Sequence, residues 1–264
     1  MKKLTRLAAA LFVGIFLTGC VEYDVQVTAN PDGTGTVKET VLFGKSMIEM
    51  LNAFAAWGGE GADDLEIYNE GELKDQARSF GEGVKFVKGE EITDGGRQGY
   101  TAHYKFSDIT KLRIDQDPEA RIPSDFSQGD DDEEPITFNF SKGSYSTLTV
   151  NLPGEFDPED FDTNFDDEEM KSEEGEELLE MLRDLRVNVK LKINGKISDT
   201  NASFVNGSNI TLMRFDMGEI IDNPKQFEAL KNRKPKNKEE MKELMDAIPG
   251  LEVELENPVK VKFK

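Results

Sequence analysis

Residues 186–195 read RVNVKLKING and carry the clearest structural pattern in the chain. Apolar and polar side chains alternate strictly from residue 186 to residue 193, which is typical of a strand with one buried face. Asn194-Gly195 then favours a tight turn, and a second such pair, Asn206-Gly207, precedes the apolar residues around Ile210. We therefore expect an antiparallel meander in this part of the chain.

The same pattern continues outward from this segment in both directions. Turn residues separate three further pairs of expected strands, at 23–28 and 36–43, at 84–92 and 98–106, and at 136–140 and 146–152. Apolar residues at helical spacing predict short helices near 47–57, 73–81, 178–182, 224 and 237–248. The predicted class is α+β, an antiparallel sheet built of hairpins and a meander with several short helices packed mainly on one face.

The first nineteen residues are typical of an export signal. Lys2, Lys3 and Arg6 precede an apolar run from 7 to 17 that is short for a permanent membrane span. The next four residues, Leu17, Thr18, Gly19 and Cys20, match a bacterial lipobox at every position. Small residues before the cysteine expose the bond to the lipoprotein signal peptidase, Leu17 fits its apolar pocket, and only a thiol accepts the diacylglycerol.

The chain has a single cysteine, and it falls at the lipobox position. We predict that residues 1–19 are removed as a signal peptide and that Cys20 carries the lipid, palmitate included; an ordinary signal peptide with a chance cysteine is the alternative. Two or three acyl chains make the attachment permanent. Because Val21 rather than aspartate follows, we expect the outer membrane in a diderm host and otherwise the outer face of the cytoplasmic membrane.

The expected first strand begins near Tyr23, so the linker between Cys20 and this strand is about 10 Å long at full extension. The folded part should therefore lie close to the bilayer. We expect residues 20–264 to form a single α+β domain with acidic loops at 115–134 and 153–177. The formal net charge is -21, and removal of three basic residues gives -21 - 3 = -24. A surface this acidic repels phosphate backbones, which excludes nucleic acid as a partner.

Few residue patterns point to chemistry. Residues 162–173 have the 1, 3, 5 and 12 spacing of a calcium loop, but Asp167 replaces the glycine required at the sixth position, which favours a solvated acidic linker. The single histidine, His103, excludes multi-histidine metal sites and is expected on the polar side of its strand. We predict no metal, no cofactor and no catalytic residue, and hence no enzyme.

Two further segments allow two interpretations each. The basic tract 231–238 contains five lysine and arginine residues; it fits a solvated connector between helices better than a contact with anionic head groups. The helix 47–57, rich in Met and Phe, fits ordinary core packing, with an apolar ligand pocket as the alternative.

A lipobox followed by an Asp32-Gly33 hairpin, Gly99-Tyr100 at the start of a strand, and the segment 186–197 together resemble the LppM-type bacterial lipoproteins. The chain departs from that pattern because it lacks a Pro-Gly pair after the strand at Val187 and a C-terminal membrane helix. The resemblance implies an α+β module next to a membrane, in contact with lipid, and no catalytic set.

These observations predict a membrane-anchored lipoprotein of the cell envelope that acts as a non-catalytic binding or interaction module. Its partners would be the membrane, through the N-terminal lipid, and a lipid or an envelope protein. One alternative is a structural or assembly lipoprotein with a protein partner. The other is an envelope glycan hydrolase that uses two carboxylates. With 53 acidic residues in the chain, pairs occur at every spacing, so the spacing of acids neither supports nor excludes this function.

Overall fold

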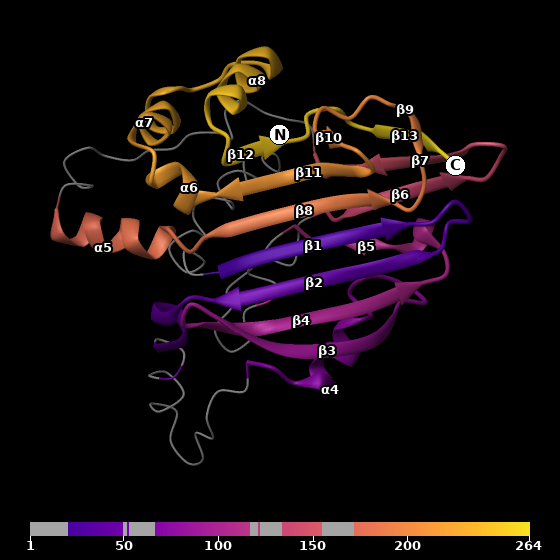
Figure 1. Ribbon diagram of the computed structural model, residues 1–264, viewed down its shortest axis with the longest axis horizontal. Coiled ribbons are helices and arrows are strands. Elements are labelled where there is room, and N and C mark those ends of the chain that lie inside the picture. Colours follow the sequence, from indigo (N-terminus) through magenta and orange to yellow (C-terminus); the bar gives the residue numbers. More distant parts are fainter. Residues whose placement is uncertain (1–20, 50–51, 53–66, 117–120, 122–133, 155–171) are drawn as a thin grey trace, which may run out of the picture.

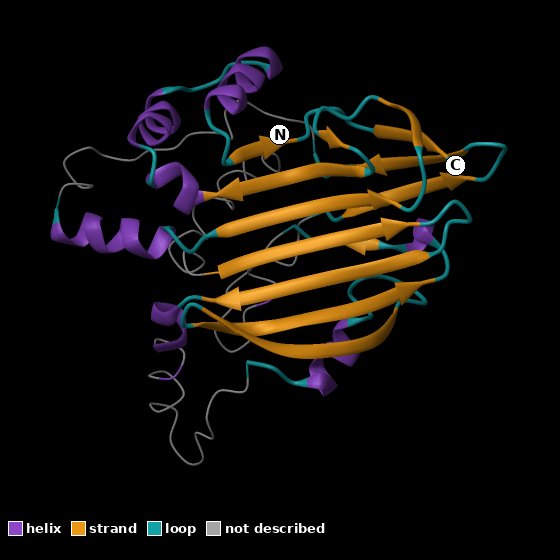
Figure 2. Cartoon of the chain, in the orientation of Figure 1, coloured by secondary structure: helices purple, strands orange, loops and turns teal. Residues whose placement is uncertain are grey.

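The computed structural model describes residues 21–49, 52, 67–116, 121, 134–154 and 172–264 (Figure 1). Strands and short helices are mixed along the chain, which confirms the predicted α+β class (Figure 2). The strands are β1 (Val21–Ala29), β2 (Gly35–Phe43), β3 (Lys85–Asp94), β4 (Arg97–Phe106), β5 (Arg113–Ile114), β6 (Ile136–Ser141), β7 (Ser146–Asn151), β8 (Arg186–Ile193), β9 (Ile197–Thr200), β10 (Val205–Asn206), β11 (Asn209–Asp216), β12 (Leu251–Val253) and β13 (Val259–Phe263). The helices are α4 (Glu70–Gln76), η1 (Ile109–Lys111), α5 (Glu173–Leu182), α6 (Met217–Ile221), α7 (Pro224–Asn232) and α8 (Lys238–Ala247).

The strands form two sheets where the sequence predicts one. The large sheet has eight strands, of which seven follow the order β10-β11-β8-β1-β2-β4-β3 while β12 pairs with β11. The second sheet has the order β5-β6-β7-β13-β9. Buried side chains of both sheets, such as Val25 of β1 and Leu148 of β7, belong to one apolar core. In Figure 1 part of the second sheet lies behind the large one.

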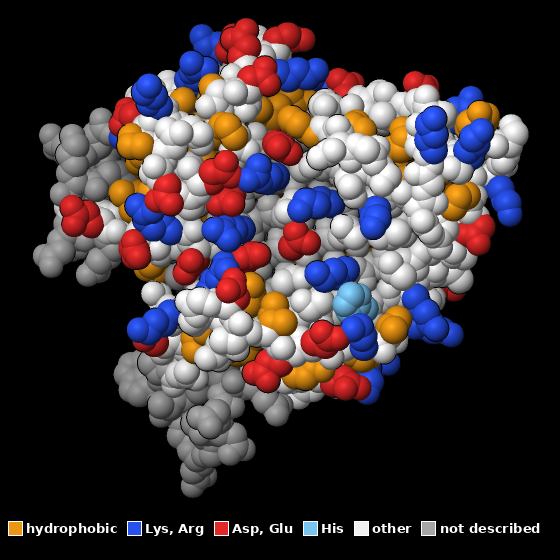
Figure 3. All heavy atoms as spheres, in the orientation of Figure 1, with side chains coloured by type: hydrophobic (Ala, Val, Ile, Leu, Met, Phe, Trp, Pro, Cys, Tyr) orange, Lys and Arg blue, Asp and Glu red, His pale blue; other side chains and the backbone are white. Residues whose placement is uncertain are grey.

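The first strand occupies the centre of the large sheet. β1 pairs antiparallel with β2 on one side and parallel with β8 on the other, with Tyr23 opposite Val187. Its odd-numbered residues from Val21 to Ala29 are all buried, while the even-numbered residues are only partly covered. The large sheet therefore has an apolar face in the core and a polar face outside, which faces the reader in Figure 3.

Local turn chemistry was predicted well. The hairpins β1–β2, β3–β4 and β6–β7 form as expected, and Gly207 has the positive φ of 63° that favours glycine in the turn between β10 and β11. Asn223 and Asn237 cap α7 and α8 by accepting hydrogen bonds from backbone amides of the first turn. The terminal strand β13 is paired on both sides.

The predicted meander after residue 186 is wrong at one step. In the folded sheet the two edges of β8 pair with β1 and β11, so neither edge is left for the segment that follows the turn at Asn194-Gly195. The chain therefore crosses to the second sheet, where β9 pairs with β13. Gly195 passes so close to the end of β13 that a Cβ there would lie 2.6 Å from the carbonyl oxygen of Lys264.

The helices lie around the large sheet (Figure 2). Helices α5 and α6 flank the end where β8 begins and β11 ends, and α7 and α8 continue from them. Helix α4 packs against β3 and buries Leu73. In the part of the chain that the structure describes, no helix has the length and apolar character needed to cross a membrane.

Candidate functional site

The predicted lipid-attachment site lies outside the described residues. This applies to Cys20 and to the recognition residues Leu17, Thr18 and Gly19, so their roles stay predictions. The same holds for most of the calcium-loop pattern at 162–173 and for most of the apolar helix at 47–57. What the structure does place is Val21, which is fully buried as the first residue of β1.

The polar face of the large sheet is the most distinctive surface. Adjacent strands bring outward side chains into rows that cross the sheet, because the register is unbroken from β8 through β1 and β2 to β4, with one shift in each of the outer pairings β11–β8 and β3–β4. Two rows lie at the end where β1 begins and two at the end where it stops. The first pair of rows carries compensated charges, and the second pair carries lysines.

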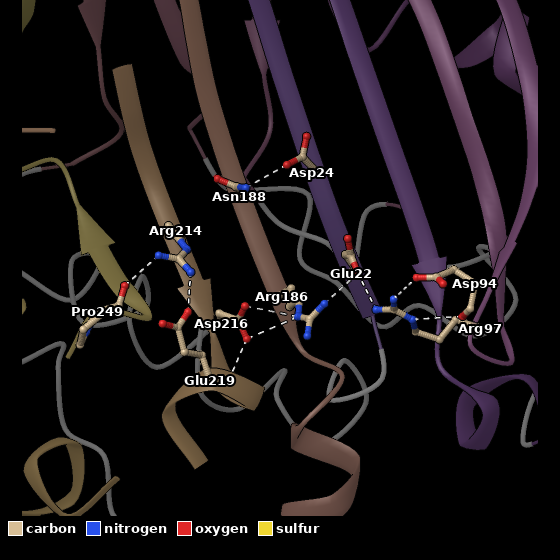
Figure 4. Close-up of polar contacts among 10 residues, drawn as sticks. All are labelled: Glu22, Asp24, Asp94, Arg97, Arg186, Asn188, Arg214, Asp216, Glu219 and Pro249. Carbon is tan, nitrogen blue, oxygen red and sulfur yellow. Dashed lines mark hydrogen bonds and ion pairs between the residues drawn. The ribbon is translucent and has the colours of Figure 1, made fainter. Parts of the chain in front are cut away.

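The row nearest the start of β1 is a chain of alternating charges (Figure 4). The Arg97 guanidinium donates to Glu22 at 2.5 Å, and Arg186 lies 3.6 Å from the same carboxylate. On its other side Arg186 approaches Asp216 at 3.4 Å. Arg97 also donates to Asp94 at 2.5 Å. Since each carboxylate and guanidinium has an opposite neighbour, this row is close to electroneutral.

The ion pair between Arg97 and Glu22 is only partly exposed. The side chains of Arg97 and Glu22 are 17% and 23% exposed, so solvent screens them less than a free surface pair. Burial opposes the charge of Arg97, but the hydrogen bond to Asp94 and the charge of Glu22 hold its pKa above the ordinary value. The row therefore joins β4, β1 and β8 across the sheet.

In the next row, Asn188 donates to the Asp24 carboxylate at 2.9 Å and Lys190 reaches the same group at 3.4 Å. The amide oxygen of Asn188 is buried without a hydrogen-bond partner in the described part of the molecule. Figure 4 shows Asn188 and Asp24 pointing toward each other from neighbouring strands. Thr40 and Thr101 continue the row, with their hydroxyl oxygens 3.1 Å apart.

The two rows at the far end of β1 hold six lysines, which we call the lysine rows. The first row pairs Lys190 with Gln26, Gln26 with Lys38, Lys38 with His103, and His103 with Lys88. The second row runs through Lys192, Thr28, Thr36, Lys105 and Lys85 in the same way. In Figure 3 blue side chains gather around the single histidine on this face.

Two acids adjoin the lysine rows. Lys88 forms an ion pair with Glu90, and Lys190 pairs with Asp24. The remaining four members form no ion pair within the described part of the chain: Lys38, Lys85, Lys105 and Lys192. Six cations and two acids leave a local charge of 6 - 2 = +4, in a chain whose formal net charge is -21.

His103 lies on the polar face, as the alternation of its strand predicts. Partial burial is the largest cause that lowers its pKa below the ordinary value, and the charges of Lys88 and Lys38 lower it further. Glu90 acts in the opposite direction. Burial and the two lysines therefore favour the neutral imidazole over the imidazolium.

A second polar cluster lies inside the core, and the sequence did not reveal it. Glu39 of β2 is fully buried on the apolar face, where the Arg121 guanidinium donates to it at 2.6 Å. The side-chain amide of Gln76 donates to both carboxylate oxygens, at 3.3 and 3.0 Å. Tyr104 donates to the oxygen of that amide at 3.4 Å.

Tyr23 completes this buried cluster. Its hydroxyl donates to the backbone oxygen of Asp115 and accepts from Arg121, both at 3.2 Å. Burial is the main cause that raises the pKa of Tyr23, so the phenol stays neutral at physiological pH. The Arg121 guanidinium also lies 5.4 Å from the centre of the Tyr23 ring and 5.5 Å from that of Phe80. The cluster ties Arg121, within the predicted acidic loop, to the core.

The alternation of residues in β2 could have indicated that Glu39 is buried. Val37, Glu39 and Val41 share one face of the strand, so an acid stands where the pattern requires an apolar residue. Arg121 gives no comparable signal, because it is 82 positions away. The cluster has a structural role that its contacts explain.

The basic tract 231–238 is a connector, as the preferred interpretation has it. It links α7 to α8, with Pro235 buried and Arg233 and Lys236 exposed. Lys231 pairs with Glu228 at 3.5 Å, and Lys238 donates to the backbone oxygen of Leu255 at 2.7 Å. Among the described residues, no group of three or more His, Cys, Asp or Glu side chains is arranged to hold a metal ion.

No protein-family model matches the chain, and no curated protein matches it either. A solved structure that is similar is the NMR structure of the folded domain of LppM from Mycobacterium tuberculosis. The two chains are 12% identical, the alignment covers 75% of this chain and 84% of that one, and the TM-score is 0.31. The resemblance to LppM-type lipoproteins expected from the sequence is thus found as a weak structural resemblance, which places the chain in no family.

Proposed function

We propose that this protein is a lipid-anchored, non-catalytic binding module of the bacterial cell envelope. The lipobox at residues 17–20 supports the anchor, and its single cysteine is the only residue that can accept the lipid. The membrane would be the outer membrane of a diderm host and otherwise the outer face of the cytoplasmic membrane.

The position of Val21 supports a close attachment. This residue follows Cys20 directly and is already buried in the central strand of the large sheet. The acyl chains would then adjoin the sheet with almost no flexible linker, and residues 20–264 would be held at the bilayer surface. A domain fixed in this way can offer only the surfaces that its orientation leaves free.

The observation that carries the binding role is the open face of the large sheet, where charge is ordered into rows. A largely antiparallel sheet packs its apolar face on the core, and its polar face is in contact with solvent or with a binding partner. Here the outward residues include paired Arg97, Glu22 and Arg186 near the start of β1 and the lysine rows beyond them. This arrangement suits recognition by charge and hydrogen bonding.

The anchor is tested by expressing the full chain in a bacterial host and measuring the mass of its N-terminal peptide. We expect the peptide to begin at Cys20 and to carry a diacylglycerol thioether, and we expect the protein in the membrane fraction. The Cys20→Ser variant should lack the added acyl mass, and Thr28→Ser serves as a matched control that keeps it. A wild-type chain that retains Met1 without acyl mass would overturn the proposal.

A further inference from the structure

The strongest charged surface that the proposed anchor does not use is formed by the lysine rows. We propose that they bind an acidic polysaccharide, laid across β8, β1, β2, β4 and β3, with carboxylate or phosphate groups along its length. This inference deepens the proposed binding role by naming the chemistry of the partner. It depends on the described residues of the sheet and on no property of Cys20.

The first argument is charge. The lysine rows hold a local excess of positive charge in a protein of net charge -21. Lys38, Lys85, Lys105 and Lys192 form no ion pair in the described part of the chain, and all four are exposed. Unpaired cations on an acidic protein attract an anion to this place and repel it from the rest of the surface.

The second argument is spacing. In the first row lysines occur on every second strand, at Lys190, Lys38 and Lys88. Strands lie about 4.8 Å apart, so the cationic positions repeat at roughly 10 Å. The second row lies two residues further along the strands, about 7 Å away. Cations spread over this length fit an extended polymer, whereas a small anion needs donors that converge on one point.

The third argument is the set of groups between the lysines. Gln26, Thr28, Thr36 and His103 occupy the intervening positions of the two rows. Their amide, hydroxyl and imidazole groups donate and accept hydrogen bonds, as sugar hydroxyls require. The first row therefore alternates ionic and hydrogen-bonding positions, and the second row holds two threonines between its lysines.

The same face argues against two other occupants. The large exposed apolar side chains of the described residues are Val87, Tyr145 and Val205, and only Val87, at the bulge of β3 next to Lys88, adjoins the lysine rows. Insertion into a bilayer requires apolar groups beside the cations, and protein partners are usually anchored by buried aromatic or apolar residues. A hydrophilic polymer needs neither.

The test uses the full-length lipidated protein in non-ionic detergent micelles, with polygalacturonate as the probe and dextran as the neutral control. We expect polygalacturonate to bind, dextran to be inert, and the affinity to fall as salt is added. Lys38→Gln with Lys105→Gln should weaken binding about 25-fold, fivefold for each lysine, or about 1 kcal/mol per cation. Lys225→Gln with Lys236→Gln makes the same change of charge elsewhere and should leave binding within twofold.

A second readout comes from His103, which is the only histidine and so gives one pair of imidazole NMR signals. The charged groups that face it are Lys38 of β2 and Lys88 and Glu90 of β3. Bound polygalacturonate should raise the pKa of His103, because nearby carboxylates favour the imidazolium. Dextran should leave it unchanged.

Three results would overturn the inference. The first is that polygalacturonate binds no better than dextran, and the second is that the control pair of substitutions weakens binding as much as the pair in the lysine rows. The third is that vesicles of phosphatidylglycerol, but not the polymer, shift the His103 signals, which would make a membrane the occupant. Failure of the anchor is distinct: an unlipidated Cys20→Ser chain should still bind polygalacturonate.

Discussion

Replacing Arg121 by methionine should destabilise the protein severely, because it leaves a carboxylate unpaired in the core. Glu39 is 0% exposed, and the Arg121 side chain is 5% exposed. Removing one partner of such a buried pair costs about 3–5 kcal/mol, since the remaining charge keeps its desolvation penalty without compensation. The two hydrogen bonds from Gln76 remain, which places the expected loss near 3 kcal/mol.

Urea unfolding followed by circular dichroism measures this loss. With a slope of about 2 kcal/mol per M, the midpoint should fall by roughly 1.5 M. The matched control is Lys74→Met, which breaks the exposed pair with Glu70 on α4, where the side chains are 58% and 54% exposed. That change should cost less than about 1 kcal/mol.

Replacing both partners distinguishes a lost pair from a lost contact. In Glu39→Leu with Arg121→Met no buried charge is left, so most of the stability lost in Arg121→Met should return. If Arg121→Met unfolds at the same urea concentration as Lys74→Met, the buried pair has no energetic importance and the reasoning is refuted.

The remaining predictions concern single residues of the large sheet. NMR titration should give His103 a pKa below 6.5, and Lys88→Gln should raise it. Because His103 has a lower pKa in the folded than in the unfolded chain, the unfolded chain binds a proton at this residue more readily. His103 therefore lowers the stability of the fold slightly as the pH falls below about 6.5. Gly99→Ala should lower the free energy of unfolding by about 1–3 kcal/mol or more in a thermal melt, since its Cβ would lie 1.9 Å from a carbonyl oxygen of β2. Gly207→Ala, which has open space around it but a φ of +63°, should lower it by about 1 kcal/mol. Glu22→Gln should cost about 0.5–1 kcal/mol, and the difference should shrink in high salt because two arginines share that carboxylate.

Local features of the fold followed from the sequence. Strand pairs joined by short turns depend on neighbouring residues, so the positions of Asn206-Gly207, of the alternating segment 186–193 and of His103 on the polar face were all predicted. The N-caps at Asn223 and Asn237 belong to the same class, because a cap and its helix are adjacent in the chain.

The non-local features did not follow. Pairing of β1 with β8, the transfer of β9 to the second sheet and the contact between Glu39 and Arg121 join residues far apart in the sequence. Each of these contacts depends on which other strands or side chains lie beside it in the folded protein. The lysine rows were missed for the same reason, since their members are unremarkable until the register of β8, β1, β2, β4 and β3 brings them together.

The parallel pairing in the middle of the large sheet also constrains the order in which the chain can fold. Tyr23 of β1 meets Val187 of β8, which lies 164 positions further along the chain, only after that whole stretch has been synthesised. Closing so long a loop is entropically costly, and contacts of this kind slow folding. Until β8 pairs with β1, one edge of β1 exposes unpaired amides and carbonyls, so the incompletely folded chain needs protection from aggregation.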